Sequence, residues 1–221
     1  MVTKAFRIRR IVLLVPFIML AAALVFSAEV KYRETIAVLR AVYNDEFMAQ
    51  ERYAAFAKKA LAEGYPQIAY FFTALSVSEG IHARNARNIL SELKSGVTRE
   101  PFKIEVSTTK ENLKYAASEE IDDIEQFLPS SLIKITPENH AAAIQTITNE
   151  LQTERLHLEL LRKIQKGTGF FFGILAKRFE GTPQRYFVCQ ACGATTTELP
   201  RQVCPVCKAG VAEYKAVEKN F

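Results

Sequence analysis

The chain has 221 residues, of which 49% are hydrophobic and 24% are charged, and these proportions describe a folded globular protein rather than a disordered one. Its net charge of +5 arises mostly from the first 28 residues, which hold four basic residues and no acidic one, so the remainder carries only +1. A nearly neutral body argues against nucleic-acid binding through a general basic surface, and the length allows one medium domain and a small one.

The first 28 residues have the pattern of a targeting segment. A basic start, MVTKAFRIRR, is followed by an uncharged run over 11–28 that ends in small residues. This pattern predicts a signal peptide cleaved near Ala23 or Ala28. The alternative is a membrane anchor formed by residues 11–28, because the run is also long enough to span a bilayer. Both interpretations place the residues after about 29 outside the cytoplasm, which indicates a periplasmic protein.

Two helices are predicted first, over 32–63 and from Pro66 to about Leu93. Gly64 ends the first, and a proline in the first turn suits the start of the second. Because the linking sequence EGYP is short, the two helices should be antiparallel neighbours.

A longer connection leads to a second pair of predicted helices. The third begins at Thr108, which forms a capping box with Glu111. The fourth is expected to open with Thr136 as its cap and Pro137 in its first turn. Two helical hairpins joined by one long crossover predict a ferritin-like four-helix bundle, so the expected fold class is mainly α.

Ionisable side chains interrupt the apolar stripe of every predicted helix. Each stripe has a glutamate near its middle, and two of these are followed three residues later by a histidine, a spacing that puts both side chains on one helix face. In a core, the carboxylates of such a group would repel one another unless cations neutralised their charge. Two divalent metals bridged by carboxylates would do so. The alternative is a solvated helix face with histidines packed in the core, but two of the only three histidines fall in this motif. The candidate ligands are Glu46, Glu79, His82, Glu120, Glu154 and His157, whereas His140 is expected to be exposed.

The composition changes after Gly167, from helical periodicity to an apolar and then turn-rich segment. The last 36 residues are short, strand-like and rich in cysteine. We therefore expect four parts: the targeting segment (1–28), the bundle (29–166), a linker (167–185) and a small metal-binding domain (186–221).

The four cysteines form two Cys-x-x-Cys pairs, with eleven residues between the pairs. This spacing is typical of a tetrahedral metal site with four thiolate ligands, Cys189, Cys192, Cys204 and Cys207. The alternatives are two disulfides, which an exported location makes more credible, and structural zinc instead of a single iron. The spacing does not distinguish iron from zinc.

Taken together, these motifs resemble the rubrerythrin family, in which a di-iron bundle is joined to a C-terminal rubredoxin-like domain. The likeness covers about residues 33–221. It rests on NDEFMAQERYAAFAKKALAEGYPQIAYFF for the first hairpin, SEGIHA for the second ligand pair, ENLKYAASEEIDD for the third helix, TERLHLELL for the fourth, and CQACG and CPVC for the two cysteine turns.

The resemblance implies a non-haem peroxidase that reduces hydrogen peroxide to water in oxidative-stress defence. It implies two iron ions in the bundle and one iron, with zinc as the alternative, at the four cysteines. It also implies an unidentified electron donor and a homodimer in which one subunit's rubredoxin-like domain approaches the other's bundle. The alternative function is a non-catalytic protein that binds and oxidises iron and carries a structural zinc ribbon.

The resemblance implies roles for two further residues. Tyr53 matches the family's tyrosine seven residues after the first ligand, and it is expected to donate a hydrogen bond to a ligand carboxylate. Asp123 stands where the family usually has a second ligand glutamate on the third helix, and its shorter side chain should weaken its hold on a metal. The sequence departs from the family at two other places, Leu128 in place of a tyrosine and the export segment.

Overall fold

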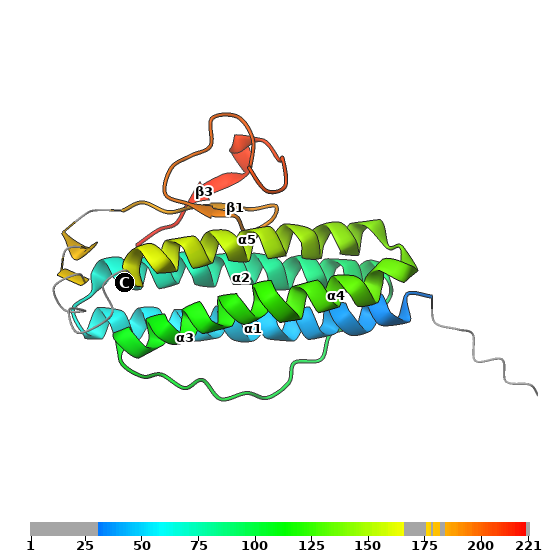
Figure 1. Ribbon diagram of the computed structural model, residues 1–221, viewed down its shortest axis with the longest axis horizontal. Coiled ribbons are helices and arrows are strands. Elements are labelled where there is room, and N and C mark those ends of the chain that lie inside the picture. The colour runs from blue at the N-terminus through cyan, green and yellow to red at the C-terminus, as the bar shows by residue number, and fades with distance from the viewer. Residues whose placement is uncertain (1–30, 166–175, 178, 182–183, 220–221) are drawn as a thin grey trace, which may run out of the picture. The chain divides into compact units, whose positions relative to one another are not determined.

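The computed structural model describes residues 31–165, 176–177, 179–181 and 184–219. It confirms the predicted fold class: a mainly helical bundle with a small cysteine-rich β domain after it (Figure 1). The bundle comprises α1 (Arg33–Ala62), α2 (Pro66–Glu92), α3 (Thr109–Asp122), a π-helical turn (Asp123–Phe127), α4 (Leu128–Ile135), a 3-10 turn (Thr136–Glu138) and α5 (Ala141–Gln165). The β domain comprises β1 (Phe187–Cys189), β2 (Thr195–Thr196), a 3-10 turn (Val211–Glu213) and β3 (Tyr214–Ala216).

The targeting segment 1–28 lies outside the described residues, and so does most of the predicted linker. Among the helices that the structure describes, none is both long and apolar enough to cross a bilayer.

The ends of the first two helices follow the sequence signals closely. Gly64 adopts a φ of +82°, a left-handed conformation that glycine accepts without strain, and it separates the two helices. Pro66 is the first residue of α2. The linker contributes as well, since the Glu180 carboxylate accepts hydrogen bonds from the backbone N–H groups of Gln67 and Ile68 and so caps α2.

The third helix begins as predicted, because the Thr108 side chain and Glu111 form the complete capping box. The helical segment then continues past Pro129. A π-helical turn starts at Asp123, and helix α4 extends beyond Pro129 to Ile135, so Figure 1 shows α3 and α4 as one continuous helical segment. A π turn inserts an extra residue into the helix, and such turns are common at functional sites.

The fourth long helix starts later than predicted. Thr136 and Pro137 belong to a 3-10 turn, and Asn139 takes a left-handed conformation that interrupts the helix before α5 begins at Ala141. His140, expected to be exposed, is half-buried: its Nδ1 accepts the backbone N–H of Ala143 at 3.2 Å, and its ring packs edge-on against Tyr32.

Two apolar clusters fill the bundle, one on each side of its middle. One contains aromatic and aliphatic side chains such as Phe56, Phe72 and Leu161. The other contains Leu39, Leu90, Leu128 and Ile147. Since the predicted glutamates and histidines lie between these clusters in each helix, the polar centre is enclosed by close-packed core at both ends.

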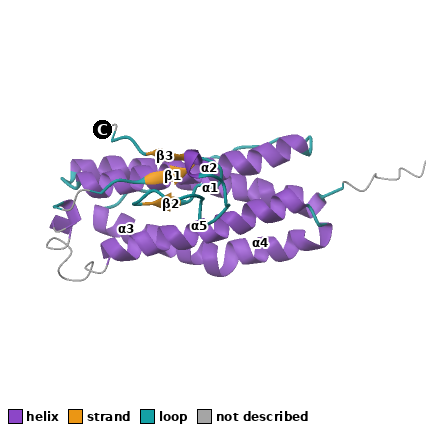
Figure 2. Cartoon of the chain, turned by 90° about the horizontal axis from the view of Figure 1, so that it is seen from above, coloured by secondary structure: helices purple, strands orange, loops and turns teal. Residues whose placement is uncertain are grey.

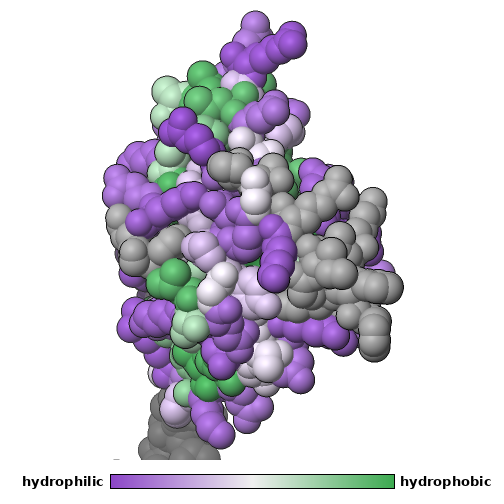
Figure 3. Space-filling view, turned by 90° about the vertical axis from the view of Figure 1, so that its left-hand side faces the viewer, coloured by the Kyte–Doolittle hydropathy of each residue, from purple (hydrophilic) through white to green (hydrophobic). Residues whose placement is uncertain are grey.

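The β domain is a three-stranded antiparallel sheet in the order β2-β1-β3. Strands β1 and β2 contact α2, and β2 also contacts α5, so the sheet lies over these two helices in both views (Figures 1 and 2). The long crossover between α2 and α3 runs along the opposite side of the bundle in Figure 1. The face in Figure 3 is mainly hydrophilic, with small separate hydrophobic areas, as expected of a surface in contact with water.

Candidate metal centres

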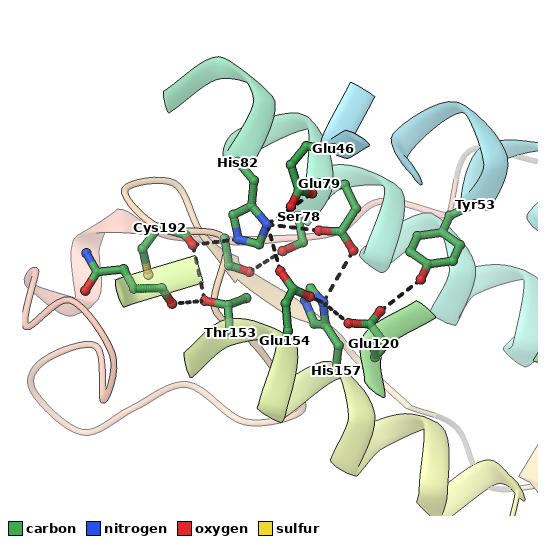
Figure 4. A network of polar contacts seen from close by, with 12 residues as sticks. Glu46, Tyr53, Ser78, Glu79, His82, Glu120, Thr153, Glu154, His157 and Cys192 are labelled. Carbon is green, nitrogen blue, oxygen red and sulfur yellow. Dashed lines mark hydrogen bonds and ion pairs between the residues drawn. The ribbon is translucent and has the colours of Figure 1, made fainter. Parts of the chain in front are cut away.

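Each of the four long helical segments places one predicted glutamate in the centre of the bundle (Figure 4). Their side chains and the two histidines are all buried, and none is more than 4% exposed. The histidines reach the same volume because each lies three residues after a glutamate on the same helix face. The residues are Glu46 from α1, Glu79 and His82 from α2, Glu120 from α3, and Glu154 and His157 from α5.

The six side chains form two overlapping groups of four. In each group the potential donor atoms lie within 4.8 Å of one another. One group is Glu46, Glu79, His82 and Glu154, and the other is Glu79, Glu120, Glu154 and His157. Glu79 and Glu154 belong to both groups, which is the arrangement expected of carboxylates that bridge two metal ions.

The inner nitrogens of both imidazoles face the carboxylates. His82 Nδ1 lies 3.0 Å from oxygens of both Glu79 and Glu154, and 3.5 Å from Glu46. His157 Nδ1 lies 2.8 Å from Glu154 and 3.3 Å from Glu79. Each imidazole therefore points one ring nitrogen toward several carboxylate oxygens, as a terminal metal ligand would.

Several of these atoms have no hydrogen-bond partner in the described part of the chain. They include both oxygens of Glu79, one oxygen each of Glu120 and Glu154, and Nδ1 of His82. Buried polar atoms without partners are costly, and a protein retains them where another group satisfies them. Four carboxylates and two imidazoles suit two iron or manganese ions, so the donor set fits the predicted di-metal site.

The protonation of these groups in the metal-free protein points to the same need for positive charge. Burial raises the pKa of Glu46 and Glu120 well above the usual range. Burial alone would lower the pKa of His82 and His157, but the nearby carboxylates outweigh it and raise both. Burial opposes ionisation of Glu154 too, yet the charges of the two imidazoles lower its pKa. Without metal, protons supply positive charge that bound metal ions would replace.

The outer nitrogens of both imidazoles contact the β domain. His82 Nε2 lies 3.0 Å from the Cys192 carbonyl oxygen, which can only accept, so this nitrogen carries the proton. His157 Nε2 lies 3.3 Å from the Thr195 hydroxyl. Partners of this kind fix the tautomer and orientation of a metal-binding imidazole, and here both come from the segment around the first cysteine pair. Figure 4 shows the contact of His82 with Cys192.

Gly193 allows this close approach. Its φ is +83°, and a Cβ added there would lie 2.5 Å from His82 Nε2 and 2.7 Å from the Ser78 hydroxyl. Ser78 donates a hydrogen bond of 2.7 Å to the Gly193 carbonyl, which holds the turn on α2. A larger residue here would force the β domain away from the histidine.

The four cysteines form the second candidate site. Their sulfurs lie within 4.8 Å of one another, and the sulfurs of Cys189 and Cys207 are 3.8 Å apart and those of Cys192 and Cys204 are 3.7 Å apart. A disulfide requires about 2.05 Å, so these are free thiols arranged as four ligands around one centre. The Tyr214 hydroxyl donates to Cys204 Sγ at 3.3 Å.

The two residues named by resemblance lie beside the bundle site. Tyr53 is buried and donates a hydrogen bond of 2.9 Å to Glu120. Asp123 is half-buried in the first position of the π turn and belongs to neither ligand group. It lines a cavity that the ligand carboxylates also line.

Sequence analysis missed several polar residues close to this site, among them Asp45, Arg52 and Glu150. Asp45 and Arg52 line the same cavity as Asp123. Glu150 is 1% exposed, and no hydrogen-bond donor among the described residues reaches either of its oxygens. The spacing offered a signal for Glu150, which lies four residues before Glu154 on the same face of α5. No periodicity singles out Asp45 or Arg52.

The fold and the two sites define a class: ferritin-like di-metal bundles that carry a four-cysteine domain. The sequence pattern of the rubrerythrin family matches residues 37–165. The chain therefore belongs to the rubrerythrin family, as its motifs indicated.

Individual relatives agree with this assignment. The chain is 28% identical to Rubrerythrin-2 of Clostridium acetobutylicum over 85% of this chain and 98% of that protein. It is 27% identical to rubrerythrin of Porphyromonas gingivalis over 88% and 96%. A structure of nigerythrin in a mixed-valence state shares the fold, with a TM-score of 0.69 over 83% of this chain and 86% of that one at 24% identity.

Proposed function

We propose that this protein is a non-haem di-iron peroxidase that reduces hydrogen peroxide to water in oxidative-stress defence, with electrons delivered through iron at the four cysteines. The observation that carries the proposal is the contact between His82 and Cys192. It joins a candidate ligand of the bundle site directly to a candidate ligand of the four-cysteine site. A storage protein has no need of this connection, whereas an enzyme that must be re-reduced after each turnover does.

The bundle residues would hold two iron ions, since Glu79 and Glu154 belong to both ligand groups and each group contains one imidazole. Ferrous iron there would supply the two electrons that, with two protons, convert one hydrogen peroxide molecule to two water molecules. The surrounding apolar clusters limit water at the site, which strengthens the electrostatic interactions within it.

Tyr53 is proposed to act on the ligand Glu120. Its O–H donates to one Glu120 oxygen, while the other has no hydrogen-bond partner among the described residues and faces the site. Burial and the charge of Glu120 raise the pKa of Tyr53 well above its usual value, so the phenol keeps its proton. Tyr53 thus orients Glu120 and holds a proton beside the reacting centre.

Peroxide consumption by reduced, iron-loaded protein tests the proposal. The control is the double variant Glu79→Ala, Glu154→Ala, which removes both carboxylates shared by the two ligand groups. We expect the unmodified protein to consume peroxide much faster. Equal rates would refute the enzyme proposal.

The alternative, an iron-binding bundle with a structural zinc ribbon, differs in the metal at the cysteines. Zinc has no redox chemistry, so the peroxidase proposal requires iron there. Elemental analysis and a visible spectrum of the purified protein distinguish the two. About three irons per chain support the peroxidase, and two irons with one zinc support the alternative.

The proposal extends to partners and location. We propose a homodimer and an external electron donor that reduces the four-cysteine iron. In the structure, the contact between the two sites is made within one chain, and sedimentation of the purified protein would test for dimers. The basic and apolar segment at 1–28 supports a location outside the cytoplasm. Fractionation would test this, and a bundle shielded from protease on the cytoplasmic side would contradict it.

A further inference from the structure

Arg52 lies between an inner cavity of the bundle and a groove on its surface. The inner one is a cavity of about 10 Å³, close to the smallest that holds one water molecule. The outer one is a groove of about 480 Å³ between α1, α3 and the crossover segment, lined by residues such as Phe56, Ser107 and Tyr115. Arg52 lines both.

An ion pair holds Arg52 in this position. Its Nη1 lies 2.6 Å from the Glu119 carboxylate, and its guanidinium lies 4.9 Å from the centre of the Tyr115 ring. The Arg52 and Glu119 side chains are 18% and 32% exposed. Because the pair is neither fully buried nor fully exposed, opening it costs less than breaking a buried ion pair.

The inner cavity leads to the candidate ligands. Four of them line it, including Glu79 and Glu120, whose buried oxygens lack hydrogen-bond partners among the described residues. Three further carboxylates line it without belonging to either ligand group: Asp45, Glu119 and Asp123.

The lining of this cavity favours one kind of solute. Seven carboxyl groups line it, and Arg52 is the one basic residue among the described lining residues. Carboxyl oxygens are the ligands that hard divalent cations prefer, and a cation replaces any proton that such a group holds. Neutral peroxide finds no comparable set of ligands in the cavity.

We propose that this cavity is the path by which divalent metal ions reach the bundle site, and that the Arg52–Glu119 ion pair closes it. Asp45, Glu119 and Asp123 bind the ion in transit, and Arg52 keeps the passage shut and its charge balanced when no ion is passing. The inference requires that the bundle binds metal, but it does not depend on peroxidase activity.

Cobalt(II) uptake by full-length protein whose bundle metal has been removed, and whose four-cysteine site still holds its metal, tests the proposal. Stopped-flow absorbance follows cobalt binding at the carboxylate–imidazole site. Retention of the four-cysteine metal is the internal reference, because it shows that the β domain is still folded on the bundle.

Arg52→Gln removes the closing charge, and we expect at least about threefold faster uptake at the bundle site. Glu119→Gln leaves the charge of Arg52 without its carboxylate partner at the entrance of the inner cavity. Uptake at the bundle site should then slow by a similar factor. The control is Lys59→Gln, which removes a basic residue and an ion pair of 3.0 Å with Glu63 elsewhere on α1; it should leave the rate unchanged. All variants should reach the same final cobalt content.

Unchanged bundle uptake in Arg52→Gln would overturn the proposal. Faster uptake in both Arg52→Gln and Glu119→Gln would show a steric barrier alone and overturn the role of the carboxylates. Loss of the four-cysteine metal from Arg52→Gln would indicate general loosening of the protein and also count against the passage.

Discussion

The two candidate metal sites of this protein are built in opposite ways. The bundle site draws its donors from four helices, and apolar clusters enclose it on both sides. The four-cysteine site draws its donors from two tight turns in a domain with strands of only two or three residues, whose small core includes the cysteines themselves. The bundle should therefore fold around its site with or without metal, whereas the β domain should depend on its metal for folding.

The largest expected effect is that of Cys204→Ser. Cys204 is fully buried, and its sulfur accepts the Tyr214 hydroxyl. We expect loss of the metal and unfolding of the β domain, because structural metal sites in small domains supply about 10–16 kcal/mol of apparent binding free energy. Limited proteolysis and metal analysis would show digestion after the bundle, with α1–α5 intact. The control Tyr214→Phe keeps all four thiols and should retain the metal; a stable β domain in Cys204→Ser would contradict the comparison.

Removal of metal from the bundle site should leave the helices formed but reverse the pH dependence of stability. In the metal-free protein the pKa values of Glu46, Glu120 and both histidines are raised. The folded state then binds protons more tightly than the unfolded one, so stability is full below the unfolded glutamate pKa of about 4.3 and falls as pH rises. The metal-loaded protein should instead gain stability with pH, because protons compete with metal for the same ligands.

Thermal unfolding at pH 5 and pH 8, with and without metal, checks this prediction. The bundle Tm should fall from pH 5 to pH 8 in the metal-free form and rise in the loaded form. The same slope in both forms would show that the buried ligands do not carry the charge assigned to them.

Gly193→Ala tests the connection between the sites rather than either site alone. The new methyl group would lie within 3 Å of His82 and Ser78, so the turn must move off α2. We expect both sites to retain their metal ions and electron transfer from the four-cysteine iron to slow by roughly ten- to a hundredfold, the usual cost of losing a partner of a ligand. Gly210→Ala is the control, since a Cβ there meets no atom within 4 Å. Equal reoxidation rates in the two variants would argue against this route.

Asp123→Ala should damage activity much less than Glu120→Ala or His82→Ala. Asp123 belongs to neither ligand group, and burial together with the neighbouring carboxylates raises its pKa to about 10 in the metal-free protein. Iron content and peroxide consumption of the three variants would be compared. If Asp123→Ala loses iron as completely as Glu120→Ala does, Asp123 is a full ligand and its shorter reach does not matter.

The smallest effect is expected for Glu150→Gln. This buried carboxyl has no donor among the described residues, and burial followed by the charge of Glu46 raises its pKa. An amide of the same shape should stabilise the metal-free bundle by about 1 kcal/mol at pH 8, because it cannot ionise and so needs no bound proton in the folded state. Iron content should not change. Loss of iron in this variant would instead make Glu150 a ligand of the bundle site.

Much of the bundle could be predicted because its signals are local. Helix periodicity, the capping box at Thr108 and the Gly64–Pro66 turn each depend on a few neighbouring residues, and Glu-x-x-His places two donors on one face. The structure adds two local irregularities. Pro129 lies within the helical segment that begins with α3, because a proline is tolerated in the first turn of α4, which follows the π turn directly. Asn139, in a left-handed conformation, delayed the start of α5.

The contacts around the site were beyond sequence analysis for a different reason. Nothing near Cys192 or Thr195 indicates that the segment packs on two histidines from 38 to 110 residues away. The same holds for Arg52 and Glu119, which are 67 residues apart. Such contacts can be recognised only in the packed structure, because neither residue departs from the local sequence pattern.

The central claim is that the four-cysteine site supplies electrons to the bundle site for peroxide reduction. Fully reduced, iron-loaded protein mixed with a slight excess of hydrogen peroxide tests it most directly, with the visible absorbance of the four-cysteine iron as the signal. We predict that the bundle oxidises first and that the four-cysteine iron then follows, while in the Glu79→Ala, Glu154→Ala variant it stays reduced. Oxidation of the four-cysteine iron at the same rate in both proteins would contradict the claim.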